Sequence, residues 1–306
     1  MRILIVGAGA VGGYFAARLH AHGRDVTILA RPRRAEQLRS TGLVVFSPHG
    51  DLTVTPKILL ATELAQHEPF DLILVGTKAY QLADAMNDFA PAAGPATAIM
   101  PLLNGMKHLE TLDARFGSDR VLGGSSQIVS DLDAEGRVHQ FGPLHDLVYG
   151  ERDKSTTPRI QAIDAAMQGC DFPSTLSPDI MAWMWRKWVL LSSLAGTTCL
   201  LRGSIGQIVA VPYGPDLIRE IIDESAAIAA ANNYPQDPKF LDAHKVRLTE
   251  PGSNLTASMY RDLSRGGPVE VDQILGDLLA HANGVHAPLL TAACVQLKVY
   301  ENTLQK

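Results

Sequence analysis

The sequence predicts an α/β amino-terminal domain built on a parallel sheet, followed by an all-α carboxyl-terminal domain. Short apolar runs alternate with helical stretches through the first part of the chain, which is typical of βαβ units around a buried parallel sheet. After the stretch PSTLSP at 173–178, the apolar spacing is helical and no strand pattern is convincing. The boundary is therefore placed near residue 175, giving domains 1–175 and 176–306.

The spacing of apolar residues predicts the elements in order. Strand patterns, including several short strands in the last range, are expected at 2–6, 25–29, 43–55, 71–77, 96–102 and within 121–150. In the same domain, helices are expected at 14–23 and up to about residue 89. Beyond the boundary, helices are expected at 179–201, 215–232, 237–248, 255–264, 268–283 and 288–303.

Composition narrows the classes of protein to consider. With 306 residues, of which 46% are hydrophobic, the chain can bury the cores of two domains. The net charge of -5 gives no general attraction for nucleic acid or anionic membranes. No apolar run is long enough to span a bilayer, and the amino terminus lacks a signal-peptide layout. Three scattered cysteines, Cys170, Cys199 and Cys294, indicate buried thiols and a cytoplasmic location. The histidine spacing predicts no metal site.

A glycine-rich stretch joins the first expected strand to the first helix. It follows the pattern GxGxxG and consists of Gly7, Ala8, Gly9, Ala10, Val11 and Gly12. A strand before it, a helix after it and a second strand next are the context in which this motif binds a dinucleotide pyrophosphate at the helix N-terminus. The alternative is a purely structural turn. The context favours binding and predicts a Rossmann-type dinucleotide-binding domain.

The residue after the second strand indicates which dinucleotide binds. Domains that bind NAD usually carry an acid there for the ribose 2′-hydroxyl. This chain has Arg31 instead, followed by Pro32, Arg33 and Arg34. A guanidinium can hold a 2′-phosphate through two hydrogen bonds, so Arg31 predicts NADP(H) as the cofactor. Arg33 and Arg34 are weaker candidates for binding the 2′-phosphate, because the spacing does not fix where their side chains point. A solvated basic loop is the alternative.

Three further polar residues are candidates for a site. Ligands bind at the carboxyl ends of strands in open parallel sheets, and Lys78 and Asn104 each follow such a strand. A solvated helix start and an ordinary Asn-Gly turn are the alternatives. Lys187 lies in 180–201, a helix that is apolar almost all round. Because burying an ammonium is costly, Lys187 either serves chemistry or reaches solvent from an exposed stripe.

Taken in order along the whole chain, these features resemble the ketopantoate reductase (2-dehydropantoate 2-reductase) family. The matching segments are ILIVGAGAVGGYFAARL, the arginine after the second strand, TKAYQ, LLNGM, WRK, and TASMYRDL followed by EVD. The resemblance implies NADPH-dependent reduction of a small 2-oxo acid to a 2-hydroxy acid. Its simplest form is ketopantoate to pantoate, in pantothenate biosynthesis.

The resemblance also implies roles for individual residues. Lys187 resembles the catalytic lysine of the family, the proton donor, and Glu270 resembles the glutamate near it, which is both catalytic and part of the cofactor site. Asn104 is similar to the asparagine that positions substrate and nicotinamide. Lys78 is similar to a lysine that lines the cofactor site, and Ser258 to the serine that contacts the substrate carboxylate.

One face of the long helix departs from the family pattern. In the biosynthetic enzymes this face carries asparagines for the distal hydroxyl of the substrate. Here the matching positions, spaced by helical turns from Lys187, are Leu191, Leu194, Ala195 and Thr198. Thr198 is the only polar group among them and is the remaining candidate for substrate binding.

Three functions therefore stay open at this point. The first is ketopantoate reduction, and the second is a family-related NADPH oxidoreductase acting on a more apolar 2-oxo acid. The third, from another class, is a regulator that senses NADP(H) without chemistry. The apolar carboxyl-terminal helices would be covered either in the core or in a homodimer.

Overall fold

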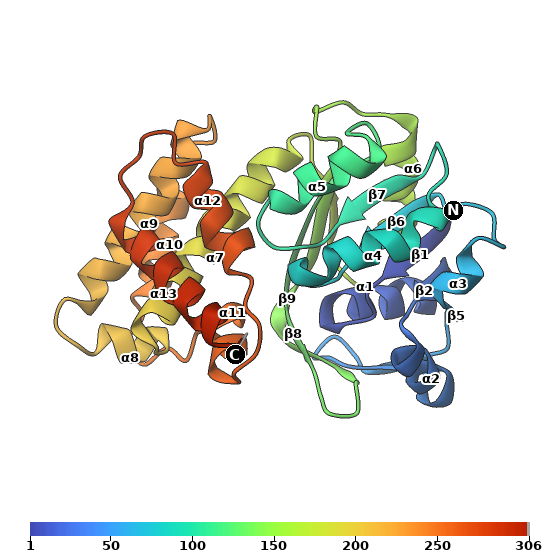
Figure 1. The fold of residues 1–306 in the computed structure, drawn as a ribbon, viewed down its shortest axis with the longest axis horizontal. Coiled ribbons are helices and arrows are strands. Elements are labelled where there is room, and N and C mark those ends of the chain that lie inside the picture. Colours follow the sequence, from blue (N-terminus) through green and yellow to red (C-terminus); the bar gives the residue numbers. More distant parts are fainter. Residues whose placement is uncertain (305–306) are drawn as a thin grey trace. The chain divides into compact units, whose positions relative to one another are not determined.

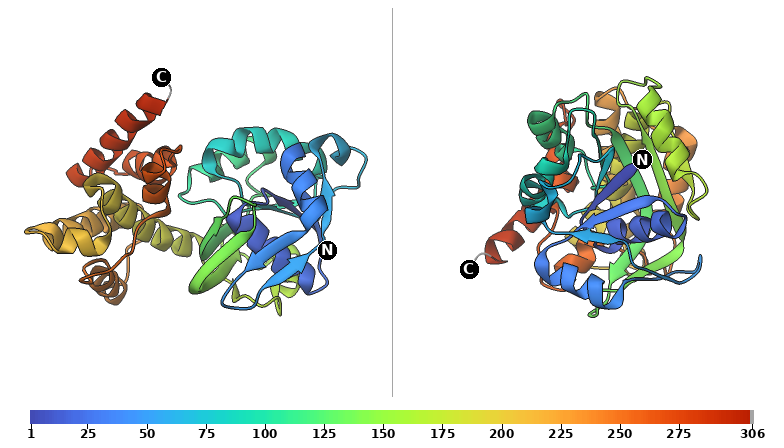
Figure 2. Two further views of the ribbon diagram at one scale, coloured as in Figure 1. Left: turned by 90° about the horizontal axis from the view of Figure 1, so that it is seen from below. Right: turned by 90° about the vertical axis from the view of Figure 1, so that its right-hand side faces the viewer.

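The computed structural model describes residues 1–304, which form two compact units (Figures 1 and 2). The first unit comprises residues 1–103 and 108–183, and the second comprises residues 104–107 and the chain from Met184 onward. The division after Trp183 falls close to the boundary expected near residue 175. Nothing in the sequence signals that residues 104–107 pack with the second unit.

A five-stranded parallel sheet, ordered β5-β2-β1-β6-β7, forms the base of the first unit and confirms the predicted fold class. Its strands are β1 (Arg2–Val6), β2 (Asp25–Leu29), β5 (Lys57–Leu59), β6 (Leu72–Val75) and β7 (Ala98–Pro101). Residues Ile3–Val6, Val26–Leu29 and all of β6 and β7 are buried, which explains their continuous apolar runs. The strand order reverses between β1 and β6, where ligands bind in sheets of this kind.

A second sheet in the same unit has the order β10-β9-β3-β4, with β8 paired to β9. Its strands are β3 (Leu43–Phe46), β4 (Leu52–Val54), β8 (Gly123–Leu132), β9 (Val138–Gly150) and β10 (Ser174–Leu176). The expectation of several short strands within 121–150 is wrong. Instead, β8 and β9 form one long antiparallel hairpin with an irregularity between Ile128 and Val129.

Helix α1 (Ala10–Ala21) packs against strands of both sheets. Its Tyr14, Phe15 and Leu19 are fully buried, in one core cluster with residues such as Ile28 of the first sheet and Leu43 of the second. This position explains the apolar composition of α1, and it fixes the helix that follows the glycine-rich stretch. The other helical elements of this unit are α2 (Pro32–Thr41), α3 (Ala61–Leu64), η1 (Ala79–Gln81), α4 (Leu82–Phe89), η2 (Ala90–Ala92), α5 (Lys107–Phe116) and α6 (Pro158–Met167).

The second unit is helical, as predicted. Its helices are α7 (Ile180–Leu201), α8 (Ile205–Val209), α9 (Gly214–Ala231), α10 (Pro238–Leu248), α11 (Ser258–Ser264), α12 (Asp277–Ala280) and α13 (Pro288–Leu304). The single helix expected at 268–283 is corrected, because a π-helical turn, η3 (Asp272–Gly276), precedes the short α12. Proline stands at the start of α9, α10 and α13, where its missing N–H has no cost.

The long helix α7 buries several hydroxyl groups: that of Thr197 has no hydrogen-bond partner among the described residues, whereas two serine hydroxyls are paired within the helix. Ser192 and Ser193 are fully buried, and their hydroxyls donate to the carbonyl oxygens of Trp188 and Val189 at 2.8 and 2.6 Å. Bonds of this kind within the helix satisfy the hydroxyls locally. Among the described residues, no helix combines the length and apolar character needed to cross a membrane.

Candidate active site

Each glycine of the GxGxxG stretch occupies a position that suits its predicted role. Gly7 has φ +92°, a conformation that favours glycine, and a Cβ there would lie 2.9 Å from Cγ2 of Thr77. A Cβ on Gly12 would overlap the carbonyl oxygen of Gly7, so α1 can start this close to β1 only with glycine. Around Gly9, in contrast, there is open space within 4 Å, as an approaching pyrophosphate requires.

Thr77 adds a polar group beside this stretch. Its hydroxyl is buried and has no hydrogen-bond partner within the described part of the chain. A buried hydroxyl without a partner is costly, and a bound phosphate would satisfy it. Together with the open space at Gly9, this observation shows that the residues fit a dinucleotide, whose binding stays a prediction.

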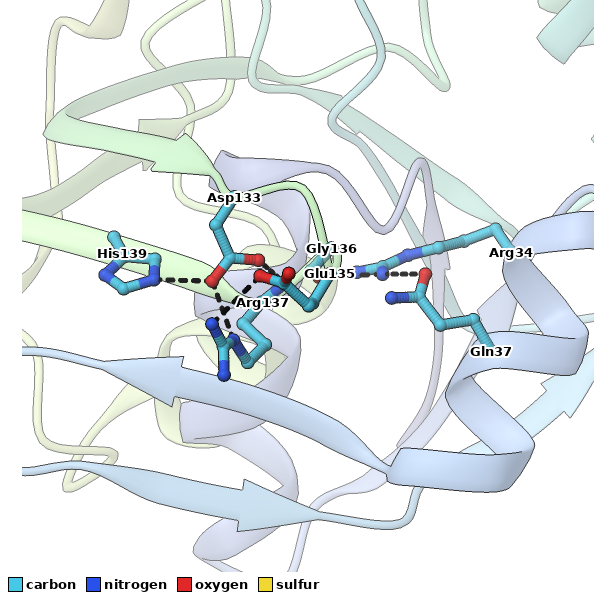
Figure 3. Close-up of polar contacts among 7 residues, drawn as sticks. All are labelled: Arg34, Gln37, Asp133, Glu135, Gly136, Arg137 and His139. Carbon is cyan, nitrogen blue, oxygen red and sulfur yellow. Dashed lines mark hydrogen bonds and ion pairs between the residues drawn. The ribbon is translucent and has the colours of Figure 1, made fainter.

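Arg34 bonds to the glycine-rich stretch at Ala8, and its other contacts, with Gln37 and Gly136, are drawn in Figure 3. Its guanidinium donates to the carbonyl oxygen of Ala8 through Nε and Nη2, at 3.2 and 3.0 Å. Nη1 donates to the carbonyl oxygen of Gly136 and to Oε1 of Gln37, both at 2.7 Å. With most of its N–H groups used, Arg34 supports the loop and is poorly placed to hold a phosphate as well.

The turn of the β8–β9 hairpin presents Gly136 to Arg34 (Figure 3). Asp133 accepts hydrogen bonds from the backbone N–H and Nε of Arg137, at 2.8 and 2.6 Å, and contacts Nε2 of His139 at 2.8 Å. Against the opposing effect of desolvation, the bonds from His139 and Arg137 hold the pKa of Asp133 well below its usual range. The turn is thus fixed as an ionised network that keeps the Gly136 carbonyl in place.

Arg31 and Lys78 follow the carboxyl ends of β2 and β6, the two strands that flank β1 in the first sheet. Arg31 is the N-cap of α2, directly beyond β2, and its exposed side chain reaches Oδ2 of Asp84 at 3.4 Å. A long contact between two exposed charged groups contributes little to stability. The guanidinium is therefore available to a ligand. Lys78 precedes η1 after β6 and is partly buried.

Asn104 is fixed by its neighbour Gly105. Gly105 has φ +72°, and a Cβ there would overlap the carbonyl oxygen of Gln273 in η3. The Asn104-Gly105 turn therefore packs directly on η3, and Met106 packs against the core of the helical unit. The structure thus brings Asn104 into the same unit as Lys187, Ser258 and Glu270.

Lys187 and Glu270 both belong to the helical unit and are a charged pair in the sense that the charge of Glu270 acts on Lys187. Lys187 keeps some exposure, whereas Glu270 is only 6% exposed. Burial lowers the pKa of Lys187 to about 8, and the negative charge of Glu270 partly opposes that effect. The lysine is therefore mostly protonated at neutral pH but is a stronger acid than an ordinary lysine.

The hydroxyl of Thr198 makes two hydrogen bonds within the protein that the sequence does not reveal. It is fully buried, and its hydroxyl donates to the carbonyl oxygen of Leu194 at 2.7 Å. The hydroxyl oxygen of Thr198 in turn accepts a hydrogen bond from the backbone N–H of Ala257 at 3.4 Å. Ala257 is the N-cap of α11, so Thr198 helps to place the adjacent Ser258, which is partly exposed. These bonds argue against a direct contact of Thr198 with substrate, which stays an untested prediction.

Sequence reasoning missed three features of the site: the support of Ala8 by Arg34, the π-helical form of η3, and a hydrogen bond from the indole N–H of Trp188 to the carbonyl oxygen of Ile274. The two side-chain contacts join segments that are far apart in the chain, and η3 receives one of them. The tryptophans around Lys187 were the only local signal of such support.

Comparison with known proteins identifies the family. Residues 3–154 match the family model "Ketopantoate reductase PanE/ApbA", and residues 179–301 match the model of its C-terminal domain. The chain is 35% identical to the uncharacterized oxidoreductase YkpB of Bacillus subtilis, over 98% of this chain and 99% of that protein.

Solved structures agree. The crystal structure of 2-dehydropantoate 2-reductase from Geobacter metallireducens superposes with a TM-score of 0.88 at 29% identity, covering 98% of this chain and 99% of the other. A ternary structure of D-mandelate dehydrogenase with NADH and anilino(oxo)acetate shares the fold, with a TM-score of 0.87 at 22% identity over 100% of this chain and 99% of the other. The protein therefore belongs to the ketopantoate reductase family of oxidoreductases, which act on CH–OH groups.

Proposed function

We propose that this protein is an NADPH-dependent reductase that converts a 2-oxo acid to a 2-hydroxy acid. The observation that carries the proposal is Lys187, an ammonium with its pKa lowered to about 8 beside the buried Glu270. Asn104 and Ser258, the polar residues expected to hold the substrate, belong to the same unit. The first unit supplies the glycine-rich stretch and Arg31 for the cofactor.

The chain's own residues complete the chemistry. NADPH, when bound, supplies a hydride to the carbonyl carbon of the substrate. The carbonyl oxygen then carries the developing negative charge, which the Lys187 ammonium stabilises before it gives up its proton. Glu270 keeps Lys187 protonated between turnovers, because its charge raises the pKa of the lysine. Asn104 and Ser258 hold the substrate, and solvent returns the proton.

Mixing NADPH with a panel of 2-oxo acids under single-turnover conditions tests the proposal. We expect at least one acid to oxidise the cofactor, seen as loss of NADPH absorbance. If none does so, the assignment to 2-oxo acids is overturned. The alternative of a regulator without chemistry is set aside, because the family is one of oxidoreductases.

Ketopantoate is the simplest substrate, but one observation favours the alternative of a more apolar acid. On the helix face beyond Lys187, Ala195 is buried, and Leu191 and Leu194 pack against the apolar core. The one hydroxyl on that face, Thr198, already bonds to the carbonyl oxygen of Leu194 and the N–H of Ala257. We therefore place a 2-oxo acid without a distal hydroxyl as the second candidate.

Substrate competition provides a sharp prediction. A hydroxyl that loses water without gaining a partner costs roughly 1–3 kcal/mol, so ketopantoate should be reduced with a kcat/KM no better than that of its analogue lacking the distal hydroxyl. A pocket of this kind rejects an added hydroxyl by about 10²-fold at most. A preference for ketopantoate above about tenfold, or 1.4 kcal/mol, would contradict the prediction and favour the biosynthetic function.

Arg34→Ala should weaken the binding of NADPH and the binding of NADH to the same extent. Arg34 touches the loop that would face the pyrophosphate, which both cofactors share, so its loss disturbs a common element. We expect about tenfold weaker binding of each, measured by titration of cofactor fluorescence. Selective loss of NADPH would instead show that Arg34 contacts the 2′-phosphate.

Location and assembly complete the proposal. Cys170, Cys199 and Cys294 are all free thiols, which supports a reducing compartment and the proposed cytoplasmic location. A homodimer is proposed as the assembly. One structural relative, from Staphylococcus aureus, is described as dimeric, although at 19% identity it shows the fold alone.

A further inference from the structure

The π-helical turn η3 lies directly beyond the glutamate of the charged pair. It starts two residues after Glu270, and the backbone N–H of Ile274 donates to the carbonyl oxygen of Glu270 at 3.1 Å. Such turns are rare, and they frequently occur at functional sites. The conformation of η3 therefore bears directly on where the Glu270 carboxylate lies.

Trp188 joins this turn to the helix of the lysine. It is the residue after Lys187, is 1% exposed, and donates from Nε1 to the carbonyl oxygen of Ile274 at 2.9 Å. Its ring is also held by Trp185, at 4.9 Å between centroids, and by His281 at 5.8 Å. A large ring fixed on two sides makes this hydrogen bond a stiff link between α7 and η3.

The Asn104-Gly105 turn approaches η3 at the residue next to Ile274. Gly105 packs so closely on the carbonyl oxygen of Gln273 that any larger residue would displace it. The lysine, the glutamate and the asparagine of the proposed reductase thus all lie beside, or are linked to, η3.

Three other charged groups near η3 and α7 contact groups within the helical unit. Asp272 pairs with Lys298 at 2.9 Å, and Asp277 lies 3.7 Å from Nδ1 of His281. The guanidinium of Arg186 lies over the ring of Phe240 at 4.2 Å. Glu270 is the group whose charge acts on Lys187.

We propose that η3 is the positioning element of the acid site and that Trp188 is the positioning residue that holds it. Through its bond to Ile274, Trp188 keeps Glu270 close to Lys187, and it does not touch the reacting atoms itself. This inference rests on the proposed reductase for its catalytic meaning, but the positioning can be measured without turnover.

The experiment compares Trp188→Phe with Trp185→Phe. Both changes remove one indole from the same buried cluster, but only Trp188 donates to η3. The titration of Lys187 is read from the pH dependence of its acylation by acetic anhydride, located by peptide mass spectrometry. We expect the pKa of Lys187 to fall in Trp188→Phe, by about one unit, because the charge of Glu270 moves away. Trp185→Phe should leave it unchanged.

Glu270→Gln tests whether Trp188 acts through Glu270. Alone, it should lower the pKa of Lys187 by about 1–3 units, and adding Trp188→Phe should cause little further change. Trp188→3-benzothienylalanine, which keeps the ring shape and removes the N–H, should reproduce the shift of Trp188→Phe if that variant folds poorly.

Three results would overturn the inference: no shift in the benzothienylalanine variant, an equal shift in Trp185→Phe, or a full second shift in the Glu270→Gln background. Because acylation needs no substrate, these results are independent of whether any 2-oxo acid is reduced. Failure of the proposed function would be seen separately, in the assay with the panel of 2-oxo acids, if none of them oxidised NADPH.

Discussion

Lys187→Ala is expected to lower kcat by at least about 10²-fold, the low end for loss of a general acid, while NADPH still binds. The ammonium lies in a largely apolar part of the second unit with Glu270 as its charged neighbour. The glycine-rich stretch, Arg31 and Lys78, which are expected to hold most of the dinucleotide, lie in the first unit, and Lys187 is not among the expected cofactor contacts. Stopped-flow measurement of hydride transfer, together with NADPH titration, separates the two effects.

The pH profile gives the same residue a second signature. Lys187 must carry its proton to act as the acid, and its pKa is lowered to about 8. The wild-type rate should therefore be level below this pH and fall tenfold for each unit above it. Lys187→Arg should keep the positive charge but lose the limb near pH 8, because a guanidinium does not release its proton in this range.

Arg186→Ala is the matched control for Lys187. It removes the adjacent charge on α7, which lies over Phe240. It should leave both kcat and the fall of the rate at alkaline pH nearly unchanged. Retained turnover in folded Lys187→Ala would contradict the role of the lysine, as would an alkaline limb that persists without it.

Features that depend on neighbours in sequence were predictable. The glycine-rich stretch is one, because the conformation of Gly7 and the close packing at Gly12 are local requirements between a strand and the next helix. The unusual status of Lys187 is another, since a lysine in an apolar helix needs an explanation whatever surrounds it. Its partner, Glu270, came only from the family resemblance.

Features that depend on distant partners were not predictable. Arg34 points at Ala8 because the hairpin turn at Gly136 supplies a second carbonyl, and that turn lies far along the chain. No helix was expected at Pro32–Thr41, where α2 begins within the run of arginines. The π-helical turn η3 contacts Trp188 and Gly105, and no spacing within 268–283 predicts either contact.

The same distinction explains Thr198. In sequence it is the only polar group on an apolar face, which suggested a substrate contact. Its hydroxyl was instead free to bond to the carbonyl one turn back, an option open to any buried threonine of a helix. Whether it does so depends on what packs on the helix, and here the hydroxyl oxygen also accepts a hydrogen bond from the N–H of Ala257.

Arg31→Ala is expected to weaken NADPH binding by roughly 1.5–3 kcal/mol, the range for hydrogen bonds to charged groups, and to leave NADH almost unaffected. This corresponds to about a 10–150-fold rise in the Kd of NADPH. The selectivity follows from position, because Arg31 stands beyond β2, where a Rossmann domain meets the ribose 2′ group. Competitive titration of the two cofactors against each variant measures it.

Two neighbouring residues sharpen the test of Arg31. Asp84 is its contact at 3.4 Å and would have to release the guanidinium to a phosphate. Asp84→Asn should therefore bind NADPH slightly more tightly than wild type, opposite in sign to Arg31→Ala. Arg33 is an exposed charge one position beyond Pro32, so Arg33→Ala should change the affinity for either cofactor little. Equal losses of NADPH and NADH in Arg31→Ala would refute the 2′-phosphate contact. Such a result would mean that Arg31 supports the fold of the loop, as Arg34 does, and that cofactor preference is set elsewhere.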